Sequence, residues 1–439
     1  MKKNLSAVAC TLACAVLTLT FSCTKESSVS KKPGSTNVTS AADTNFVTLD
    51  QANAAALQIP TSALAGNSMK TKQVDGTIAA VTREIQDYIV YPNAQTPSLY
   101  IFNYKGGGFV VMPADKRVHP ILAISSTGYF QISDQLPAGL NNWLAVNHKN
   151  MQTLRQNTTI ARPKNVDKMW AQLVPPSVNN SGITIDKAAP PPPPCEPTSS
   201  TQQVGPLVKT TWAQGVPYNQ WSLMPYGTYY AGGGKAPTGC VATAMGQILY
   251  YWQRPISYNW SVMPLTSTSY TSVGETEVSR LMWNLGQSVG MVYTDTSAAP
   301  SNSSPTVISN ALRGSYCNFA SASEATYSNT SSYPTVMSNI NSNEPLILIG
   351  DTQTDGHAWV CDGYMQITST WCPSNGNPGG GETTLLFDMN WGWNEAPVPG
   401  YVTEPNVDGW YDFNQWEVYN GPDLEYFQYN LAMIYNIHP

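Results

Sequence analysis

The pattern of apolar and polar positions is most distinctive between Cys240 and Gln253, where the chain carries neither a charge nor a proline. Apolar residues recur there at steps of three and four in two adjacent stripes, which predicts an α-helix that is apolar on nearly all sides. Gly239 permits a tight approach of the chain before it, and Arg254 followed by proline ends it. We therefore expect a buried helix that begins at Cys240 and lies in the centre of a domain.

The other elements follow from the same spacings. Three glycines between two apolar runs, in Lys105-Gly-Gly-Gly108, indicate a β-hairpin. A hydroxyl three residues before a glutamine, in Thr48 to Gln51, is a capping-box signal for a helix. The expected elements are helices over 48–59, 140–155 and 277–291, strands over 88–91, 99–104, 109–112, 346–349, 357–362 and 385–389, and a turn and strand over 115–124. This content predicts an α+β fold, with an antiparallel sheet in the second half.

The start of the chain has the pattern of an export signal. Met1-Lys2-Lys3 is basic, and the apolar stretch after it ends near Phe21, which is too short for a membrane span. The ending at Ser22-Cys23 resembles a bacterial lipoprotein signal, in which Cys23 is acylated; cleavage of an ordinary signal nearby is the alternative. We expect residues 1–22 to be the signal and 23–43 a flexible tether. A lipid anchor would then be the only contact with a membrane.

A proline-rich stretch divides the remainder. At 439 residues the chain is too long for one ordinary domain. Residues 163–203 include Val174-Pro175-Pro176-Ser177 and the run Pro190 to Pro194 followed by Cys195 to Thr201; these segments should be extended and exposed. They separate an N-terminal domain over 44–162 from a C-terminal domain over 204–439. Because proteases cut exposed linkers, we expect maturation between Lys164 and Val204.

Composition narrows the function. Charged residues make up 11% of the chain, against about 25% in average globular proteins, and such a polar but uncharged surface suits a secreted protein. The net charge of −6 comes with no basic run, which argues against a nucleic-acid partner. Only two histidines lie beyond residue 200, and no cysteine and histidine spacing indicates a metal site or another cofactor.

Cysteine usage leaves one thiol available for chemistry. Cys10 and Cys14 fall in the signal, and five cysteines remain after Cys23. If Cys240 stays free, the other four form at most two disulfides, with Cys361 and Cys372 as the nearest pair.

Cys240 is a candidate nucleophile because of its position. The first turn of a helix concentrates unpaired N–H groups and the positive end of the dipole, which favours thiolate over thiol. A cysteine placed there is more often an inert core residue, so a partner base is needed. His119 lies in the N-terminal half, His148 in a polar helical stretch and His438 near the end, which leaves His357, before a strand-like run, as the partner.

Four motifs resemble one family. Gly239 to Ile248 resembles the cysteine helix of the streptopain family, secreted bacterial papain-like cysteine peptidases; His357 to Tyr364 resembles their histidine strand, and Asn390-Trp-Gly-Trp393 the motif after it. The segment from Gly205 to Asn219 resembles the start of the mature enzyme. The resemblance implies a papain-like domain in which a cysteine helix packs on an antiparallel sheet.

The same resemblance assigns roles. Cys240 would attack the peptide bond and His357 would share its proton, while Gln214 and the N–H of Cys240 would bind the oxyanion. Asn390 would orient His357, and Trp391 would shield that hydrogen bond. Two segments depart from the family, an extended loop over 366–381 and the stretch from 394 to 410. Both are expected to flank the cleft and to alter substrate preference.

The N-terminal half resembles the propeptide of streptopain-like zymogens through Gly107 to Val111, Asp115-Lys-Arg117 and Pro120-Ile-Leu122. The resemblance implies an inhibitory prodomain; a small α+β domain of unknown role is the alternative. We expect an extracytoplasmic cysteine endopeptidase, secreted or lipid-anchored, that acts on proteins or peptides and is inhibited by its own prodomain. The alternatives are a non-catalytic surface-binding protein, such as an inactive peptidase or adhesin, and an acyl-transfer enzyme of the same fold.

Overall fold

A computed structural model describes residues 30–31, 44–59, 83–132, 136–157, 160–162, 164–173, 199–222, 235–266, 273–294, 298–302, 304–327, 329–351, 356–370, 381–393, 406–412 and 429–439. The expected signal peptide, the lipidation site Cys23 and most of the expected tether lie outside these residues. So do positions 174–198 of the expected linker and most of the insertion from 394 to 410.

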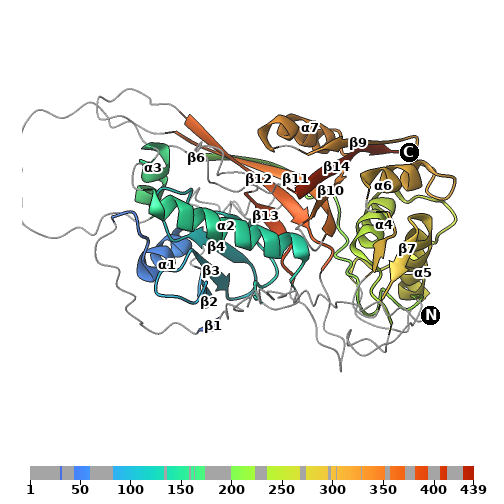
Figure 1. Cartoon of the computed structure of the whole chain (residues 1–439), viewed down its shortest axis with the longest axis horizontal. Helices are drawn as coiled ribbons and strands as arrows, with labels where there is room; N and C mark the ends of the chain where they lie inside the picture. The colour runs from blue at the N-terminus through green and yellow to red at the C-terminus, as the bar shows by residue number, and fades with distance from the viewer. Residues whose placement is uncertain are drawn as a thin grey trace, which may run out of the picture.

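One sheet runs through the described part of the molecule. Figure 1 shows the N-terminal helices and strands at one end, α4 to α6 at the other, and the long strands β11 and β12 between them. The sheet has twelve strands in the order β1-β2-β3-β4-β5-β13-β12-β11-β10-β14-β9, and β6 pairs with β11 outside this path. All of its pairings are antiparallel. The α+β fold class and the antiparallel sheet are confirmed.

The elements of the first half are β1 (Ser30–Lys31), α1 (Leu49–Gln58), β2 (Ile85–Tyr91), β3 (Leu99–Tyr104), β4 (Phe109–Pro113), β5 (Ala123–Ser125), α2 (Ala138–Gln156) and α3 (Lys164–Leu173). Those of the second half are β6 (Ser199–Val204), α4 (Cys240–Trp252), a 3-10 turn (Trp260–Val262), α5 (Val273–Ser288), β7 (Met291–Tyr293), β8 (Ala298–Pro300), α6 (Pro305–Arg313), β9 (Ser321–Thr326), α7 (Asn329–Asn341), β10 (Leu346–Asp351), β11 (Gly356–Thr370), β12 (Gly381–Asn390), β13 (Gly409–Tyr411) and β14 (Tyr429–His438).

The central helix α4 forms where the apolar pattern predicts it. Every residue from Val241 to Leu249 is buried. Gly239 precedes it with φ at 88°, and a Cβ there would lie 2.8 Å from the carbonyl oxygen of Ala298, so only glycine allows this entry. Gln253 ends the helix in the left-handed conformation, just before the predicted stop at Arg254.

Local signals in the N-terminal half are also confirmed. Thr48 and Gln51 form the predicted capping box, with both reciprocal bonds at 3.2 Å. Strands β3 and β4 form the predicted glycine-turn hairpin. The turn and strand expected over 115–124 are present as a turn at Asp115 to Val118 and the short strand β5 at the end of that range. Within the turn, Arg117 donates to the carboxylate of Asp115.

The linker prediction was too long at both ends. Helix α3 lies inside the expected range because Val166 and Trp170, four residues apart, are buried and the Trp170 indole donates to the carbonyl of Val118 at 2.8 Å. Strand β6 also lies inside it, although Ser199 to Thr201 was expected to be irregular. Its ladder with β11 pairs Tyr364 with Val204 and supplies the hydrogen bonds that this polar segment lacks locally.

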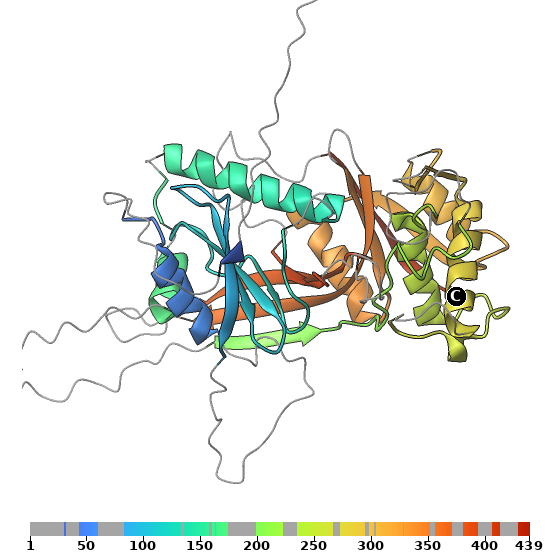
Figure 2. The same ribbon diagram turned by 90° about the horizontal axis from the view of Figure 1, so that it is seen from below.

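The prediction of a loop over 366–381 is wrong at both ends of that range. Strand β11 continues to Thr370 and β12 begins at Gly381, so the two form one long hairpin, of which residues 371–380 are not described. Met365 and Ile367 in this extension are buried against α1 and β2 to β4. Figure 2 shows the hairpin reaching across to the N-terminal elements, and packing against them explains why it is long.

The two halves share backbone pairing and packing. Strand β5 pairs with β13 through Ile124 with Trp410 and Ala123 with Tyr411. The Trp143 indole of α2 donates to the carbonyl of Asp412 at 3.0 Å and meets the Tyr411 ring edge-on at 5.2 Å. Helix α2 therefore packs on the second half of the chain as well as on its own strands. No helix in the described residues has both the length and the apolarity that crossing a bilayer requires.

Replacing Trp143 with alanine should loosen the junction between the two halves. The side chain is 1% exposed, and such truncations cost about 3–5 kcal/mol. Urea unfolding of the uncleaved chain, followed by far-ultraviolet circular dichroism, measures the loss. Trp221, which is 47% exposed, is the control, since its alanine variant should change stability by less than about 1 kcal/mol. Equal losses would contradict the packing role of Trp143.

Candidate active site

Cys240 is the first residue of α4 and lies against strand β11. Burial raises the pKa of its thiol, and hydrogen bonds from the backbone N–H groups of Ala358, Val241 and Cys240 itself oppose that rise without cancelling it. Two of these donors belong to the first turn of the helix, where N–H groups have no partner within the helix. The thiol is therefore protonated at neutral pH in this conformation, although donors for a thiolate already surround it.

His357 is the second residue of β11 and is 4% exposed. Its Nε2 bonds to the carbonyl oxygen of Trp391 at 2.9 Å, and its ring stacks on Trp359 with a centroid distance of 5.9 Å and an angle of 14°. Burial lowers the pKa of the imidazole to about 4, although the bond to Trp391 acts in the opposite direction. The ring is therefore neutral at physiological pH.

The cysteine and the histidine meet at the same strand but not at the same face. Successive strand side chains point to opposite faces. Ala358 and Val360 join the core closed by α4, whereas Trp359 joins the core under α2, and the imidazole stacks on Trp359. Among the described residues, no hydrogen bond or charge interaction joins the imidazole to the sulfur of Cys240.

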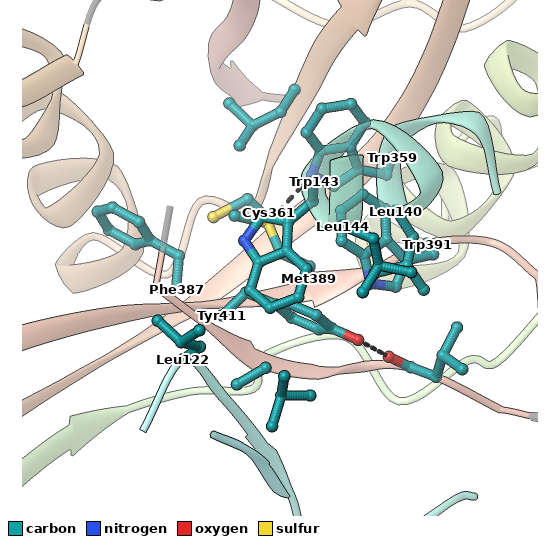
Figure 3. Packing of buried hydrophobic residues seen from close by; sticks show 14 of the residues in the cluster. Leu122, Leu140, Trp143, Leu144, Trp359, Cys361, Phe387, Met389, Trp391 and Tyr411 are labelled. Carbon is teal, nitrogen blue, oxygen red and sulfur yellow. Dashed lines mark hydrogen bonds between the residues drawn. The ribbon is translucent and has the colours of Figure 1, made fainter. Parts of the chain in front are cut away.

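The N-terminal end of α2 covers His357. A Cβ built on Gly139 would lie 2.9 Å from Cζ3 of Trp391 and 3.4 Å from Cδ2 of His357, so the helix backbone touches both rings. Figure 3 shows Leu140, the next residue of α2, and Leu144, about one turn further along, beside Trp359 and Trp391. The burial that lowers the pKa of His357 therefore comes in part from the N-terminal domain.

Gln214 lies next to the segment that leads into α4. The residue is 7% exposed, and its backbone carbonyl oxygen accepts from the backbone N–H of Thr238 at 2.9 Å. This bond ties the loop of Gln214 to Thr238, two residues before Cys240. The predicted oxyanion residue and the predicted nucleophile thus lie in adjoining segments.

Among the described residues, no hydrogen bond joins the side chains of Asn390 and His357. Its Nδ2 donates to the carbonyl of Thr210 at 2.8 Å and to Oε1 of Gln247 at 3.0 Å, and its Oδ1 accepts from the N–H of Gly392 at 3.2 Å. The backbone carbonyl of Trp391 occupies the position beside His357 that the resemblance assigned to the Asn390 amide. The indole of Trp391 stacks near the imidazole, with centroids 6.4 Å apart.

Sequence reasoning missed Gln247. It is fully buried on α4 and forms a reciprocal pair with Asn390, in which its Nε2 donates to Oδ1 at 3.0 Å. The signal was present, because Gln247 is an uncharged amide in an otherwise apolar helix, seven residues after Cys240 and therefore on nearly the same face. A buried amide needs partners, and its position pointed towards the site.

A second missed feature is an acidic cavity of about 210 Å³ that Asn390 helps to line. Asp362 accepts from the N–H of Val208 at 2.7 Å, and Asp408 accepts from the N–H of Trp391 at 2.8 Å, while the other carboxylate oxygen of Asp408 has no partner. Burial raises the pKa of Asp362 and of Asp408 to about 7. The cavity is lined by Ser125, Thr210, Asp362, Asp388, Asn390 and Asp408 among others.

The described cysteines carry no disulfide. Cys240, Cys317 and Cys361 are free. Cys361 therefore forms no disulfide and lies fully buried in β11 within the core under α2, whereas Cys372 lies outside the described residues. Within the described ranges, no group of histidine, cysteine and carboxylate side chains is arranged to hold a metal ion.

Each half of the chain matches a known protein family. Residues 212–257 and 256–397 match the Peptidase C10 family, and residues 44–151 match the Spi protease inhibitor family. The fold is similar to that of a Prevotella intermedia prointerpain A fragment, with a TM-score of 0.52, 22% identity and coverage of 82% of this chain and 99% of that one.

Two relatives cover both halves. Streptopain from Streptococcus pyogenes is 24% identical over 341 residues, 67% of this chain and 71% of its own length. The thiol protease/hemagglutinin PrtT from Porphyromonas gingivalis is 24% identical over 353 residues, which are 72% of this chain but only 35% of that protein. Residues 212–397 therefore form a domain of the Peptidase C10 family of cysteine peptidases, the streptopain family, and residues 44–151 before it in the chain form a Spi protease inhibitor domain.

Proposed function

We propose that the protein is an extracytoplasmic cysteine endopeptidase, made as a zymogen, that hydrolyses protein or peptide substrates with Cys240 and His357. The observation that carries the proposal is the environment of Cys240. Its sulfur lies at the start of a buried helix, receives three backbone N–H groups, and adjoins the residue that follows His357. An inert core cysteine has no need of such donors, whereas a thiolate nucleophile does.

The chemistry follows from these positions. The Cys240 thiolate attacks the carbonyl carbon, and the N–H of Cys240 and the side-chain amide of Gln214 receive the oxyanion. The His357 imidazolium gives its proton to the leaving amine as the C–N bond breaks and a thioester remains. Water then attacks the thioester, its proton passes to the imidazole, and the carboxylic acid and the thiolate are released.

The N-terminal domain keeps this machinery apart. In the uncleaved chain, α2 covers the imidazole and burial favours the neutral forms of both His357 and Cys240. Removal of α2 would expose the ring to solvent and allow it to pair with the thiol. The inhibitor domain therefore acts by withholding one half of the catalytic pair.

Export and anchoring are proposed from the sequence alone. The basic start and apolar stretch of residues 1–22 support secretion, and Cys23 supports attachment through a lipid. The carboxyl-terminal side of the anchor, through residue 43, would serve as a tether. Metabolic labelling with a radioactive fatty acid, compared with a Cys23→Ser variant, tests the anchor.

A thiol-directed peptide inhibitor should label Cys240 once the chain is cut at a protease site introduced within residues 174–198. The Cys240→Ala variant should lose both labelling and peptide hydrolysis. Cys317→Ala is the matched control and should keep both, because burial raises the pKa of the Cys317 thiol to about 12. Mass spectrometry of the labelled peptide identifies the site. Labelling elsewhere, or none after cleavage, would favour the surface-binding alternative, and a product joined to an added amine would favour acyl transfer.

Cleavage of the chain should change the pH dependence of the rate at which iodoacetamide alkylates Cys240. Burial raises the pKa of the thiol in the uncleaved chain, so the thiolate fraction is small at neutral pH and the rate should keep rising above pH 8. After cleavage the thiolate gains solvent and an imidazolium partner, so the pKa should fall and a plateau should extend to acidic pH. Rates from pH 4 to 9 on both forms test this, and superimposable profiles would contradict the blocking role of α2.

A Gly139→Val variant should expose the site in the uncleaved chain without any substitution in the peptidase domain. The added side chain would overlap Trp391 and His357, and such overpacking costs about 1–3 kcal/mol. A shift of 1.4 kcal/mol is about tenfold in population, so labelling of Cys240 in the uncleaved chain should rise by roughly that factor. The cleaved enzyme should be unchanged. Ala145→Val, at an exposed position of the same helix, is the control; equal effects of the two variants would exclude the contact as the block.

A further inference from the structure

The amides of Gln247 and Asn390 connect the helix of Cys240 to the segment that holds His357. Gln247 Nε2 donates to Asn390 Oδ1, and Asn390 Nδ2 donates to Gln247 Oε1, both at 3.0 Å. The Thr210 hydroxyl donates to the same Oε1 at 3.0 Å. Gln247 is fully buried and Asn390 is 7% exposed. Bonds of this kind are shielded from water, so breaking one leaves an unpaired polar atom in the core.

The backbone fixes which way both amides point. The carbonyl of Thr210 can only accept, so the Asn390 atom that meets it must be Nδ2. The N–H of Gly392 can only donate, so its partner must be Oδ1. With Asn390 fixed, Gln247 has a single orientation that satisfies both of its contacts. The network is therefore directional and cannot flip without losing hydrogen bonds.

This network sets the turn that presents the Trp391 carbonyl. The bond from Gly392 to Asn390 spans the Trp391 peptide, and Gly392 has φ at 66°, a conformation open to glycine. The carbonyl within that turn is the partner of His357 Nε2. Because a carbonyl only accepts, Nε2 carries the proton of the neutral ring and Nδ1 keeps its lone pair. That is the tautomer a base for the Cys240 thiol requires.

We propose that Gln247 is a positioning residue for the cysteine and histidine pair. It holds the turn from Asn390 to Gly392 against the helix of Cys240, so that the Trp391 carbonyl anchors His357 Nε2 at a fixed place relative to the sulfur and leaves Nδ1 for the thiol. Gln247 touches neither substrate nor reacting atoms. The inference rests on the proposed function and adds the residue that sets the geometry between its two partners.

The test compares Gln247→Met with wild type in the full chain after cleavage at the introduced linker site. Methionine keeps the volume but makes none of the amide bonds. We expect kcat to fall about 10- to 100-fold with KM within about threefold, since orientation and not substrate binding is lost. The alkaline limb of kcat/KM should move to lower pH, because the Trp391 carbonyl stabilises the imidazolium. Ile248→Val, a buried change on the same helix, is the control for a general loss of packing.

Two further variants test the positioning role if the methionine variant folds poorly. Gln247→Glu should recover activity relative to wild type as pH falls, because a protonated carboxyl offers one donor and one acceptor to Asn390. Thr210→Val removes only the hydroxyl donor and should give a smaller loss of kcat, with the alkaline limb moved in the same direction.

The outcomes separate this inference from the function on which it rests. If cleaved wild type neither hydrolyses peptides nor reacts with the thiol probe, the proposed function fails. If wild type is active and Gln247→Met behaves like Ile248→Val, the positioning role alone is overturned. A lower kcat with an unmoved alkaline limb also overturns it, since the loss would then not pass through His357. Absence of recovery in Gln247→Glu at acidic pH counts against it as well.

Discussion

The site depends on one constraint, the burial of a helix N-terminus against the backbone of a strand. The first turn of α4 leaves N–H groups without partners inside the helix, and burial denies them water. The sulfur of Cys240 receives two of them and a third from Ala358 of β11. A thiol is a weak acceptor and a thiolate a strong one, so the arrangement gains most when the proton leaves. The same packing that makes the domain core therefore prepares the cysteine.

Burial also explains why Cys240 and His357 stay in their neutral, unreactive forms in the uncleaved chain. Isolated charges are costly in a core, so a buried thiol and a buried imidazole each keep their neutral form until they can pair. In the uncleaved chain no charge interaction joins them among the described residues, and α2 covers the histidine. The acidic cavity follows the same rule. Desolvation raises the pKa values of its carboxyl groups, and the causes of these shifts include no cation.

The sequence predicted elements whose causes are local and left out those whose causes are distant. Local residue spacing and turn residues predict helix α4, the capping box at Thr48 and the hairpin around Lys105. The extension of β11 past Gln366 has no such signal, because its stabilising partners are residues of α1 and β4 far along the chain. Strand β6 is polar and forms only because β11 offers it a ladder.

The candidate residues divide in the same way. The chemistry of Cys240 and His357 could be inferred from residue type and motif, since each motif lies within one element. That the Trp391 carbonyl and not the Asn390 amide would meet His357 depends on the register of β11 with β12, which pairs Val360 with Asn390. A backbone group carries no side-chain identity, so sequence reasoning had no residue type from which to infer it.

The long hairpin of β11 and β12 connects the catalytic site to the surface on which the inhibitor domain packs. Its near end carries His357 and Asn390, and its far end buries Met365, Ile367 and Leu386 against the inhibitor domain. Two ladder pairs between β5 and β13 contribute about 1 kcal/mol per hydrogen bond, far less than the cores on either side of them. Cutting the linker removes the covalent connection between the two domains, so the inhibitor domain can then dissociate. Release must uncover those residues, which gives a freed inhibitor domain a matching surface to bind again.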